Sequence, residues 1–300
     1  MLQQIYRGYK NTDPSPKQQK AIPVSVLRKM RNIAKLQKSP FPLARATLAC
    51  LAFFFCMRSC EYSRTTSNES KRTQILKVKN FRFFKNKRLL SHSNPALATA
   101  DLVDVTFEFQ KNDERNESVG MHSAQATHDF MCPVKLAAEV VQRVRSYPGS
   151  TDDSPINLMM TDDGKIFQIT SKSIRTQIKT TVEIIGPKKL GFSKDDVGTH
   201  SIRSGGAMAL HLAGVSPLTI MLIGRWRSEA FLLYIRKQVQ KFSEGLSDRM
   251  LQTEDYFTTP DYRNISGPAA PVPAFESQNI HGLSHKSLGT WRHPSAISAY

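Results

Sequence analysis

The sequence lacks the motifs that would assign it to several common enzyme classes. It has no GxxxxGK phosphate-binding loop and no GxGxxG fingerprint, so nucleotide hydrolysis and dinucleotide chemistry have no support. Its four cysteines form no CxxC pair; they are Cys50, Cys56, Cys60 and Cys132. This spacing predicts neither a zinc ribbon nor a disulfide framework, and we expect a reducing compartment.

Long apolar runs are absent too. The first ten residues contain no apolar h-region, so we expect no signal peptide and no secretion. The longest apolar stretch, residues 46–57, is too short to span a bilayer and predicts a buried helix. We therefore expect no membrane partner.

Acidic residues are scarce at one end of the chain. The 300 residues include 42 Lys and Arg against 25 Asp and Glu, a net charge of +17. Residues 1–90 alone hold 20 Lys and Arg and only three acidic residues, Asp13, Glu61 and Glu69. Such an imbalance indicates a polyanionic partner, most often nucleic acid. The alternatives are a solubilising basic surface or contact with an anionic membrane.

The hydrophobic pattern predicts a mainly helical α+β domain with a small antiparallel sheet. We expect a polar linker at 1–22, the domain at 23–248 and a mostly disordered tail at 249–300. The expected helices cover 24–37, 42–62, 132–146, 172–185, 199–214, 217–224 and 229–242. The expected strands cover 75–78, 81–84, 102–109 and 118–122, with a hairpin turn at KNDERNE, residues 111–117.

His200 and Arg203 form the first candidate site, in the segment HSIR. Residues three apart share one face of a helix, so both side chains can converge on a single anionic group. This spacing also arises by chance, and a capping histidine beside a surface arginine is the plain alternative.

Trp226 and Tyr234 follow in the segments GRW and LLYIR. A tyrosine phenol titrates at about pH 10, so its attack on phosphorus requires a proton acceptor and an electropositive pocket. His200 can accept that proton, and Arg203 can hold a phosphodiester with two hydrogen bonds. The Trp226 indole can donate to a phosphate oxygen. The alternative for both aromatic residues is core packing.

Arg58 ends the apolar stretch, where a solvated arginine has little reason to be. Glu61 lies three residues later, so the pair is interpreted as a second phosphate-binding guanidinium with a supporting carboxylate. A structural ion pair at a helix end is the alternative. Lys111 lies at the expected hairpin, where an ammonium can protonate a leaving oxygen. Lys77 and Lys79 compete for that role, and a hairpin lysine is usually just solvated.

The order RxxE, hairpin Lys, HxxR, aromatic residue and Tyr-bearing helix resembles the catalytic domain of the tyrosine recombinase (phage-integrase) family. The resemblance covers residues 23–245, and 1–22 is similar to that family's interdomain linker. The segment GRWRSEAFLLYIR is especially similar to recombinases of eukaryotic mobile elements, the Crypton and DIRS-like groups. Trp226 and Tyr234 are eight residues apart, one fewer than in the better-known phage and bacterial members.

This resemblance implies a site-specific recombinase or integrase that cuts and rejoins DNA strands through a 3′-phosphotyrosine, with no metal or other cofactor. Six side chains would carry the chemistry, with Glu61 supporting one of them: Tyr234 as nucleophile, Arg58 and Arg203 as phosphate clamps, His200 as base, Lys111 as acid and Trp226 as a phosphate donor.

Double-stranded DNA is the expected partner, bound chiefly through its phosphates. The candidate contacts are Lys29 and Arg31 on the first basic helix and Lys77 and Lys79 before the sheet. The resemblance also implies a homo-oligomer, a tetramer on paired sites when active, with the segment after Tyr234 as a contact between neighbours. It implies a nuclear location if the chain is eukaryotic and a cytoplasmic one otherwise.

Two other classes compete with this interpretation. A metal-dependent nuclease would use the aspartate pairs at 152–153, 162–163 and 195–196. Adjacent side chains point apart, however, and these settings favour turns and helix caps. The stronger rival is a catalytically inactive or domesticated relic of a mobile-element recombinase that still binds DNA. The presence of every candidate catalytic residue argues against this relic.

Overall fold

The structure is a computed structural model of the 300-residue chain. It describes residues 19–65, 74–108, 116–124 and 130–226. The chain divides into two units, Met1–Glu244 and Gly245–Tyr300, and every described residue belongs to the first. Lys111, Tyr234 and the expected tail therefore lie outside the described residues.

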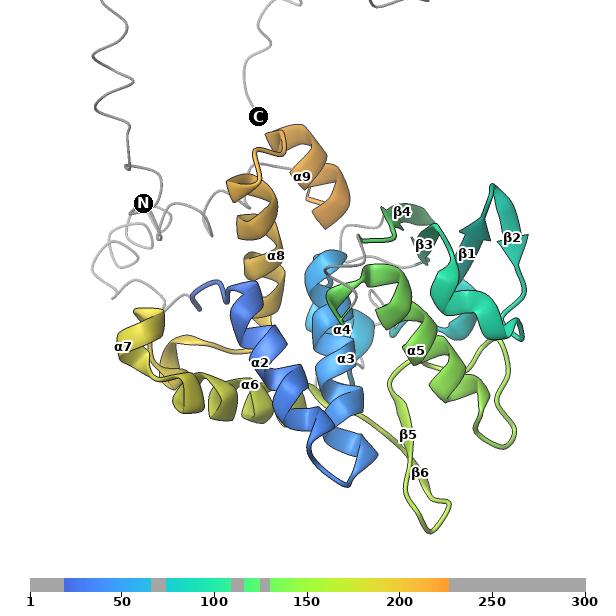
Figure 1. The fold of residues 1–300 in the computed structure, drawn as a ribbon, viewed down its shortest axis with the longest axis horizontal. Coiled ribbons are helices and arrows are strands. Elements are labelled where there is room, and N and C mark those ends of the chain that lie inside the picture. The colour runs from blue at the N-terminus through green and yellow to red at the C-terminus, as the bar shows by residue number, and fades with distance from the viewer. Residues whose placement is uncertain (1–18, 66–73, 109–115, 125–129, 227–300) are drawn as a thin grey trace, which may run out of the picture. The chain divides into compact units, whose positions relative to one another are not determined.

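Helices dominate the first unit, and a small sheet lies at one side of it (Figure 1). The helices are α2 (Val24–Lys35), α3 (Pro40–Phe54), α4 (Ser59–Tyr62), α5 (Pro133–Arg145), α6 (Ser171–Ile185), α7 (Pro187–Leu190), α8 (His200–Leu212) and α9 (Pro217–Gly224). The strands are β1 (Phe81–Lys85), β2 (Arg88–Leu90), β3 (Leu102–Phe107), β4 (Glu117–His122), β5 (Leu158–Met160) and β6 (Ile166–Gln168). Short 3-10 turns are η1 (Val78–Asn80), η2 (Pro95–Thr99) and η4 (Lys194–Asp196). The expected α+β class is confirmed.

Helix α3 is central to the core because nearly all of its sequence, PFPLARATLACLAFF, is apolar. Ser39 caps its start by accepting from the Phe41 N–H, and prolines suit a first turn that lacks intrahelical partners. Helices α2, α5, α6 and α8 all contact α3, and Figure 1 shows it between α2 and α5. Such burial on all sides confirms the buried helix that the apolar run predicts.

The four-stranded sheet has the order β2-β1-β3-β4, and all its pairs are antiparallel. Along β3, Val103, Val105 and Phe107 are buried, and α5 contacts β1, β3 and β4. The register pairs Val105 with Val119, so residues 108–116 connect two adjacent strands. This pairing confirms the expected hairpin strands on either side of Lys111.

The short strands were not predicted. Strands β2, β5 and β6 have three residues each, too few to show an alternating pattern. The expected strand at 75–78 is wrong, because Val78 begins η1 instead. The TDDG turn at 161–164 is confirmed between β5 and β6, where Gly164 has φ +80°.

The expected helix over 42–62 is wrong in its second half. Helix α3 ends at Phe54, and α4 begins at Ser59. Between them Cys56 has the left-handed φ of 45°, and the Met57 N–H donates to the Ala52 carbonyl at 2.9 Å. Arg58 is extended and caps α4. Arg58 therefore does not continue α3, and the carbonyl oxygens of Phe55 and Cys56 are available to accept from side chains.

Two glycines allow α8 to lie directly against neighbouring backbone, Gly206 against the end of α3 and Gly205 against Ile22, which precedes α2. A Cβ at Gly206 would lie 2.3 Å from the Phe53 carbonyl oxygen, and one at Gly205 would lie 2.3 Å from the Ile22 oxygen. Both obstacles are backbone atoms, which cannot swing aside as a side chain can. These contacts fix the first turn of α8, which carries His200 and Arg203, beside the connection that leads to Arg58.

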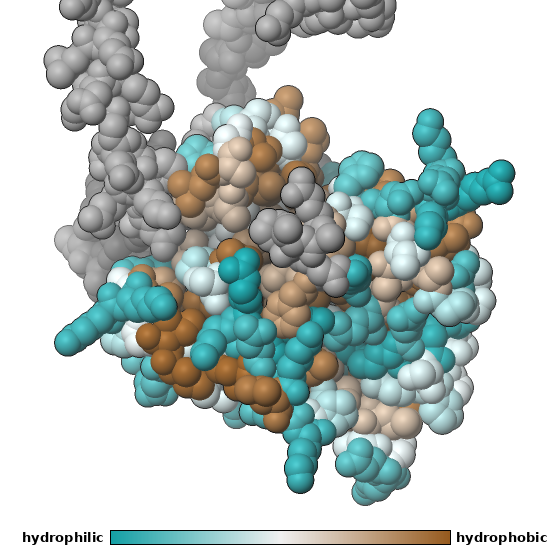
Figure 2. Space-filling view, in the orientation of Figure 1, coloured by the Kyte–Doolittle hydropathy of each residue, from teal (hydrophilic) through white to brown (hydrophobic). Residues whose placement is uncertain are grey.

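Apolar side chains gather on the surface over α8 and α9 (Figure 2). Leu212, Leu218 and Leu222 are 48%, 66% and 67% exposed, respectively. Exposed leucines grouped in this way are typical of a protein contact surface. Among the described residues, no helix combines the length and apolar character needed to cross a membrane.

Candidate active site

Three segments that are distant in sequence meet at the start of α4. The Arg58 Nη2 reaches the Arg225 carbonyl oxygen at 3.4 Å across 167 positions of sequence. The Arg203 Nη2 donates to the Gly224 carbonyl oxygen at 2.5 Å. We call the group formed here the arginine cluster; it consists of Arg58, Glu61, His200, Arg203, Arg225 and Trp226. Five of its six members were predicted from the sequence.

Arg58 is held by Glu61 at two points. The Arg58 backbone N–H donates to Glu61 Oε2 at 2.8 Å, and Arg58 Nη1 donates to Glu61 Oε1 at 3.1 Å. The Arg58 side chain is 17% exposed, whereas Glu61 is 1% exposed. Glu61 therefore fixes the guanidinium from the protein interior while part of Arg58 still reaches solvent, as a phosphate-binding group requires.

Glu61 remains ionised despite its burial. Burial alone raises the pKa of its carboxyl group, but the charges of Arg225, Arg203 and Arg58 outweigh that effect and hold the pKa below its usual range. The carboxylate accepts from Arg225 Nη2 at 2.8 Å as well as from Arg58. One buried acid thus joins two arginines from different segments.

Arg203 is buried, with 3% exposure. Its two Nη atoms donate to the carbonyl oxygens of Cys56 and Gly224. Burial lowers its pKa to about 10, so the guanidinium is still charged at neutral pH. A guanidinium carries five N–H donors, and these two carbonyls leave capacity for a phosphate. The break after α3 supplies the Cys56 carbonyl, which an unbroken helix would have used internally.

His200 is the first residue of α8, and its side chain is exposed. Surrounding protein atoms, together with Arg203 and Arg58, lower the pKa of its imidazole below the usual 6.5. The ring is therefore neutral at pH 7 and able to accept a proton. This state fits the role of general base that the sequence predicts.

Trp226 serves the core and the cluster together. Its ring packs with Ala207, Met208 and Ile220, and the Arg203 guanidinium lies 4.1 Å from the ring centroid. A Cβ at Gly224 would lie 1.6 Å from the Trp226 ring, so only glycine permits this arrangement. The sequence left core packing and donation to a phosphate as alternatives. The contacts show core packing together with stacking on Arg203, and donation to a phosphate stays a prediction.

Arg225 is the cluster member that sequence reasoning missed. It is 3% exposed, has φ 55°, and donates from Nη1 to the Phe55 carbonyl oxygen at 3.1 Å. Its guanidinium carbon lies 3.5 Å from the Phe107 ring centroid. The available signal was its place in GRW, but an arginine after an apolar helix is usually a surface residue. Burial next to Glu61 depends on the tertiary fold.

The cluster carries a net positive charge. Three guanidiniums face one carboxylate, which leaves two positive charges when His200 is neutral. Burial raises the pKa of the neighbouring Cys56 thiol to about 11, so Cys56 adds no negative charge at neutral pH. The arrangement can stabilise a dianionic phosphorane-like group.

The predicted DNA contacts fare differently from one another. Lys29 is exposed on α2. The prediction that Arg31 contacts DNA is corrected, because the Arg31 side chain is buried. Arg31 is only 7% exposed, and its Nη2 binds Glu139 Oε2 at 2.5 Å. Arg31 lies four residues after the buried Leu27, so both side chains lie on the core face of the amphipathic helix α2.

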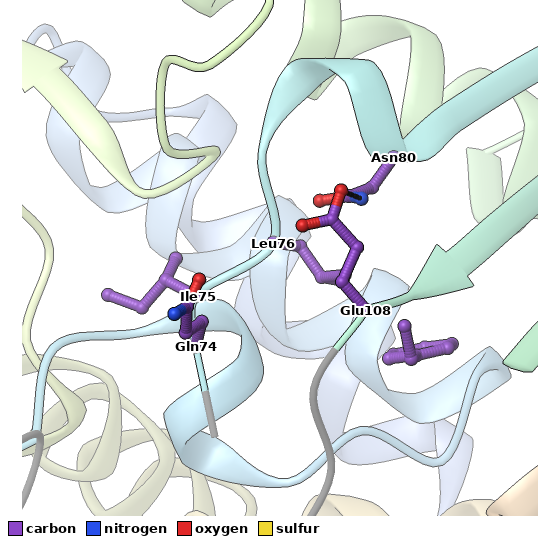
Figure 3. Close-up of a pocket in the computed structure, with 6 residues that line it drawn as sticks. Gln74, Ile75, Leu76, Asn80 and Glu108 are labelled. Carbon is purple, nitrogen blue, oxygen red and sulfur yellow. Dashed lines mark hydrogen bonds between the residues drawn. The ribbon is translucent and has the colours of Figure 1, made fainter. Parts of the chain in front are cut away.

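Lys77 and Lys79 lie near the sheet and both bind Asp153, at 2.9 and 3.0 Å. Lys79 also reaches Glu108 at 3.5 Å. Figure 3 shows Glu108 beside Asn80 in a small pocket, where the Asn80 amide donates to the Glu108 carboxylate at 3.0 Å. Carboxylates therefore partly neutralise this basic site, and a phosphate would have to compete with them.

Lys111 and Tyr234 lie outside the described residues, but the segments before them are placed. Strand β3 ends at Phe107, beneath the Arg225 guanidinium. Trp226 is the last described residue before Tyr234. Phe107 and Trp226, the nearest preceding residues with contacts in the arginine cluster, both lie at that cluster.

The aspartate pairs serve as turns, caps and ion-pair partners. Asp196 accepts from the Ser193 N–H at 2.9 Å in a capping box, and Asp163 lies in the β5–β6 turn. Asp152 lies 3.4 Å from Arg145. Within the ranges that the structure describes, no group of three or more His, Cys, Asp or Glu side chains is placed to hold a metal ion.

Comparison with known proteins yields likenesses of structure. No family model and no curated protein matches the chain. The XerH site-specific recombinase bound to palindromic difH substrate is 18% identical, with a TM-score of 0.47 over 78% of this chain and 54% of that one. XerA recombinase is 12% identical, with a TM-score of 0.43 over 82% of this chain and 68% of that one. The Tn1549 transposon integrase in complex with circular intermediate DNA is 10% identical, with a TM-score of 0.40 over 77% of this chain and 68% of that one. The chain spans about half the length of the XerH chains it matches.

Proposed function

We propose that this chain is a tyrosine recombinase that cuts and rejoins DNA strands through a 3′-phosphotyrosine intermediate. The observation that carries the proposal is the convergence of Arg58, His200 and Arg203 with Trp226 at one place. The chemistry of these groups suits a phosphodiester, since two guanidiniums can bind its oxygens and a neutral imidazole can accept a proton.

The cleavage step transfers one phosphoryl bond. The Tyr234 phenolic oxygen attacks the scissile phosphorus, and His200 takes the phenolic proton. The bond from phosphorus to the 5′ oxygen breaks, and Lys111 protonates that oxygen to give a 5′ hydroxyl. The 3′ phosphate remains joined to Tyr234, so the reverse attack by a 5′ hydroxyl rejoins the strand with no nucleotide consumed.

Fixed positive charge is the main source of rate acceleration in this scheme. The pentavalent state gains negative charge on its equatorial oxygens, next to Arg58 and Arg203. Glu61 already orients Arg58 before substrate arrives. No reorganisation of Arg58 is then needed during the reaction, which is why preorganised donors stabilise a transition state well.

DNA binding must uncover Arg203 if it is to contact the phosphate. The Trp226 ring stacks on its guanidinium, and Arg203 is 3% exposed. We expect Trp226 to move when DNA binds, so that its indole N–H can donate to the phosphate. The resting state would then be closed, and cleavage would depend on assembly with the substrate.

Duplex DNA and further copies of the chain are the proposed partners. The basic N-terminal ninety residues support the first, and the exposed leucines over α8 and α9 support a protein contact. The resemblance of the segment GRWRSEAFLLYIR further favours the recombinases of eukaryotic mobile elements, and a eukaryotic source would imply a nuclear location.

A DNA-binding relic is the second candidate. The burial of Arg203 and the stacking of Trp226 over it favour this alternative, because a locked site would bind DNA without cutting it. The relic and the recombinase share the fold and the basic surface. They differ in whether a covalent bond to DNA forms.

Covalent trapping separates these two candidates. Purified protein is incubated in EDTA with end-labelled duplexes that carry a nick beside a randomised sequence, and the products are resolved on a denaturing gel. The recombinase is expected to give a labelled band that survives denaturation and disappears with protease. Salt-sensitive binding with no such band would favour the relic.

A further inference from the structure

We propose that Arg225 is a positioning residue that holds Glu61, and through it Arg58, in the geometry needed for the scissile phosphate. This inference rests on the proposed function. Arg225 touches no group that would react. Its Nη2 binds Glu61 Oε2 at 2.8 Å, and the same oxygen accepts the Arg58 backbone N–H at 2.8 Å.

The contacts of Arg225 connect three segments at the cluster. Its Nη1 donates to the Phe55 carbonyl in the break before α4, and its own carbonyl accepts from Arg58 Nη2 at 3.4 Å. Its guanidinium lies over Phe107, at the end of the strand that leads to Lys111. Trp226 follows it directly in the chain. Arg225 thus ties the RxxE turn, the hairpin strand and the Trp-bearing turn together.

Charge explains why a buried arginine is used here. Glu61 and Arg225 are each 1% exposed at the side chain, so Glu61 without Arg225 would be a buried carboxylate with Arg58 as its one remaining arginine ion-pair partner and the charge of Arg203 nearby. Arg58 would then be drawn inward to satisfy Glu61, away from the solvent side on which a phosphate arrives. With Arg225 in place, Glu61 is already neutralised, and Arg58 keeps positive charge for the substrate.

The test compares cleavage of two nicked duplexes that differ only in the chemical group at the scissile position. One carries the ordinary scissile phosphate, and the other carries a methylphosphonate, which has lost the negative charge that Arg58 must neutralise. The proteins are the wild type, Arg225→Met, Arg225→Lys, Arg58→Ala and Arg143→Met. Arg143 is a control because it is a partly buried arginine that donates to the Ile156 carbonyl at 2.7 Å, away from the cluster.

On the ordinary phosphate we expect Arg225→Met to form adduct about 100-fold more slowly, with unchanged DNA affinity. Arg225→Lys should recover part of the rate because it restores the charge beside Glu61. On the methylphosphonate both Arg225→Met and Arg58→Ala should approach the wild-type rate. Arg143→Met should match the wild type on both substrates.

Two results would overturn the role of Arg225. One is a wild-type rate for Arg225→Met on the ordinary phosphate, and the other is a defect of equal size on both substrates, which would mark general damage to the fold. If the wild type forms no adduct with either duplex, the proposed function fails instead. Thermal unfolding of Arg225→Met, Glu61→Gln and the double variant still measures the coupling between Arg225 and Glu61. Additive losses of stability would contradict the Arg225–Glu61 contact, and non-additive losses would support it.

Discussion

At the scale of single residues, the cluster is organised around one buried carboxylate. Glu61 binds Arg58 and Arg225, and the attraction of three arginines keeps it ionised against the cost of burial. Removing Glu61 or Arg225 would leave the other residue as a buried charge without its ion-pair partner. Such a loss is far more costly than losing a surface ion pair. The arginines are therefore positioned by the fold before any phosphate arrives.

His200 gives the first prediction at this scale. Its pKa lies below 6.5, so the imidazole is neutral at pH 7 and above. Adduct formation should be constant from pH 7 to about pH 8 and should fall in acid, as the imidazole takes a proton and can no longer accept one from Tyr234. Single-turnover rates across this range give the profile.

The matching variants identify the group that titrates. His200→Gln should lower the rate at pH 7 by about 100-fold and abolish the acid limb. His211→Gln, on the same helix, should leave the profile unchanged. An acid limb that survives in His200→Gln would assign the base to another group.

At the scale of elements, the site depends on a helix that ends early and a helix that packs closely. The break after α3 leaves the carbonyls of Phe55 and Cys56 to accept from Arg225 and Arg203. Gly206 in α8 allows its backbone to lie against the end of α3. These two features set the distance between the arginine of RxxE and the pair in HxxR.

Gly206→Ala tests this packing. Its Cβ would lie 2.3 Å from the Phe53 carbonyl oxygen, so α8 would have to move away from α3. We expect a loss of about 1–3 kcal/mol in the free energy of unfolding and a clear loss of adduct formation. Urea denaturation and the trapping assay measure the two effects.

Gly120→Ala in β4 is the matched control. Its Cβ would lie 3.3 Å from a Leu102 methyl group, a side-chain atom that can shift. Stability and adduct formation should therefore change little. A Gly206→Ala protein that resembles this control would show that close packing of α8 is not required.

Much of the site could be predicted at this scale because it follows from local pattern. The apolar run gave a buried helix, and residue spacing placed His200 and Arg203 on one face of α8. The inward turn of Arg31 and the burial of Arg225 could not be predicted, since both depend on acids far away in sequence, Glu139 and Glu61. The end of α3 was missed because residues 55–58 contain neither Gly nor Pro.

At the scale of the whole molecule, the uneven charge is the dominant feature. The chain has a net charge of +17, and the excess is concentrated in the first ninety residues. Such a distribution favours phosphate contacts that do not depend on base sequence. Binding to DNA and selection of a target are then separable properties.

Salt dependence tests this view. Because each phosphate contact releases condensed counterions, affinity for a duplex should fall by about 1,000-fold between roughly 50 and 200 mM salt. Lys29→Gln should weaken binding and make the slope shallower, while Lys165→Gln, in the β5–β6 turn, should do neither. Fluorescence anisotropy at several salt concentrations gives both slopes. A nearly flat response would contradict an electrostatic DNA interface.

Identification of the residue that bears the DNA tests the central claim most directly. The trapped adduct is digested with nuclease and trypsin, and the peptide that retains a nucleotide is sequenced by mass spectrometry, alongside a Tyr234→Phe protein in the same assay. We predict a nucleotide on Tyr234 and no adduct from Tyr234→Phe. An adduct that persists in Tyr234→Phe, with the nucleotide on another tyrosine such as Tyr256, would contradict the assignment of Tyr234 as the nucleophile of the arginine cluster.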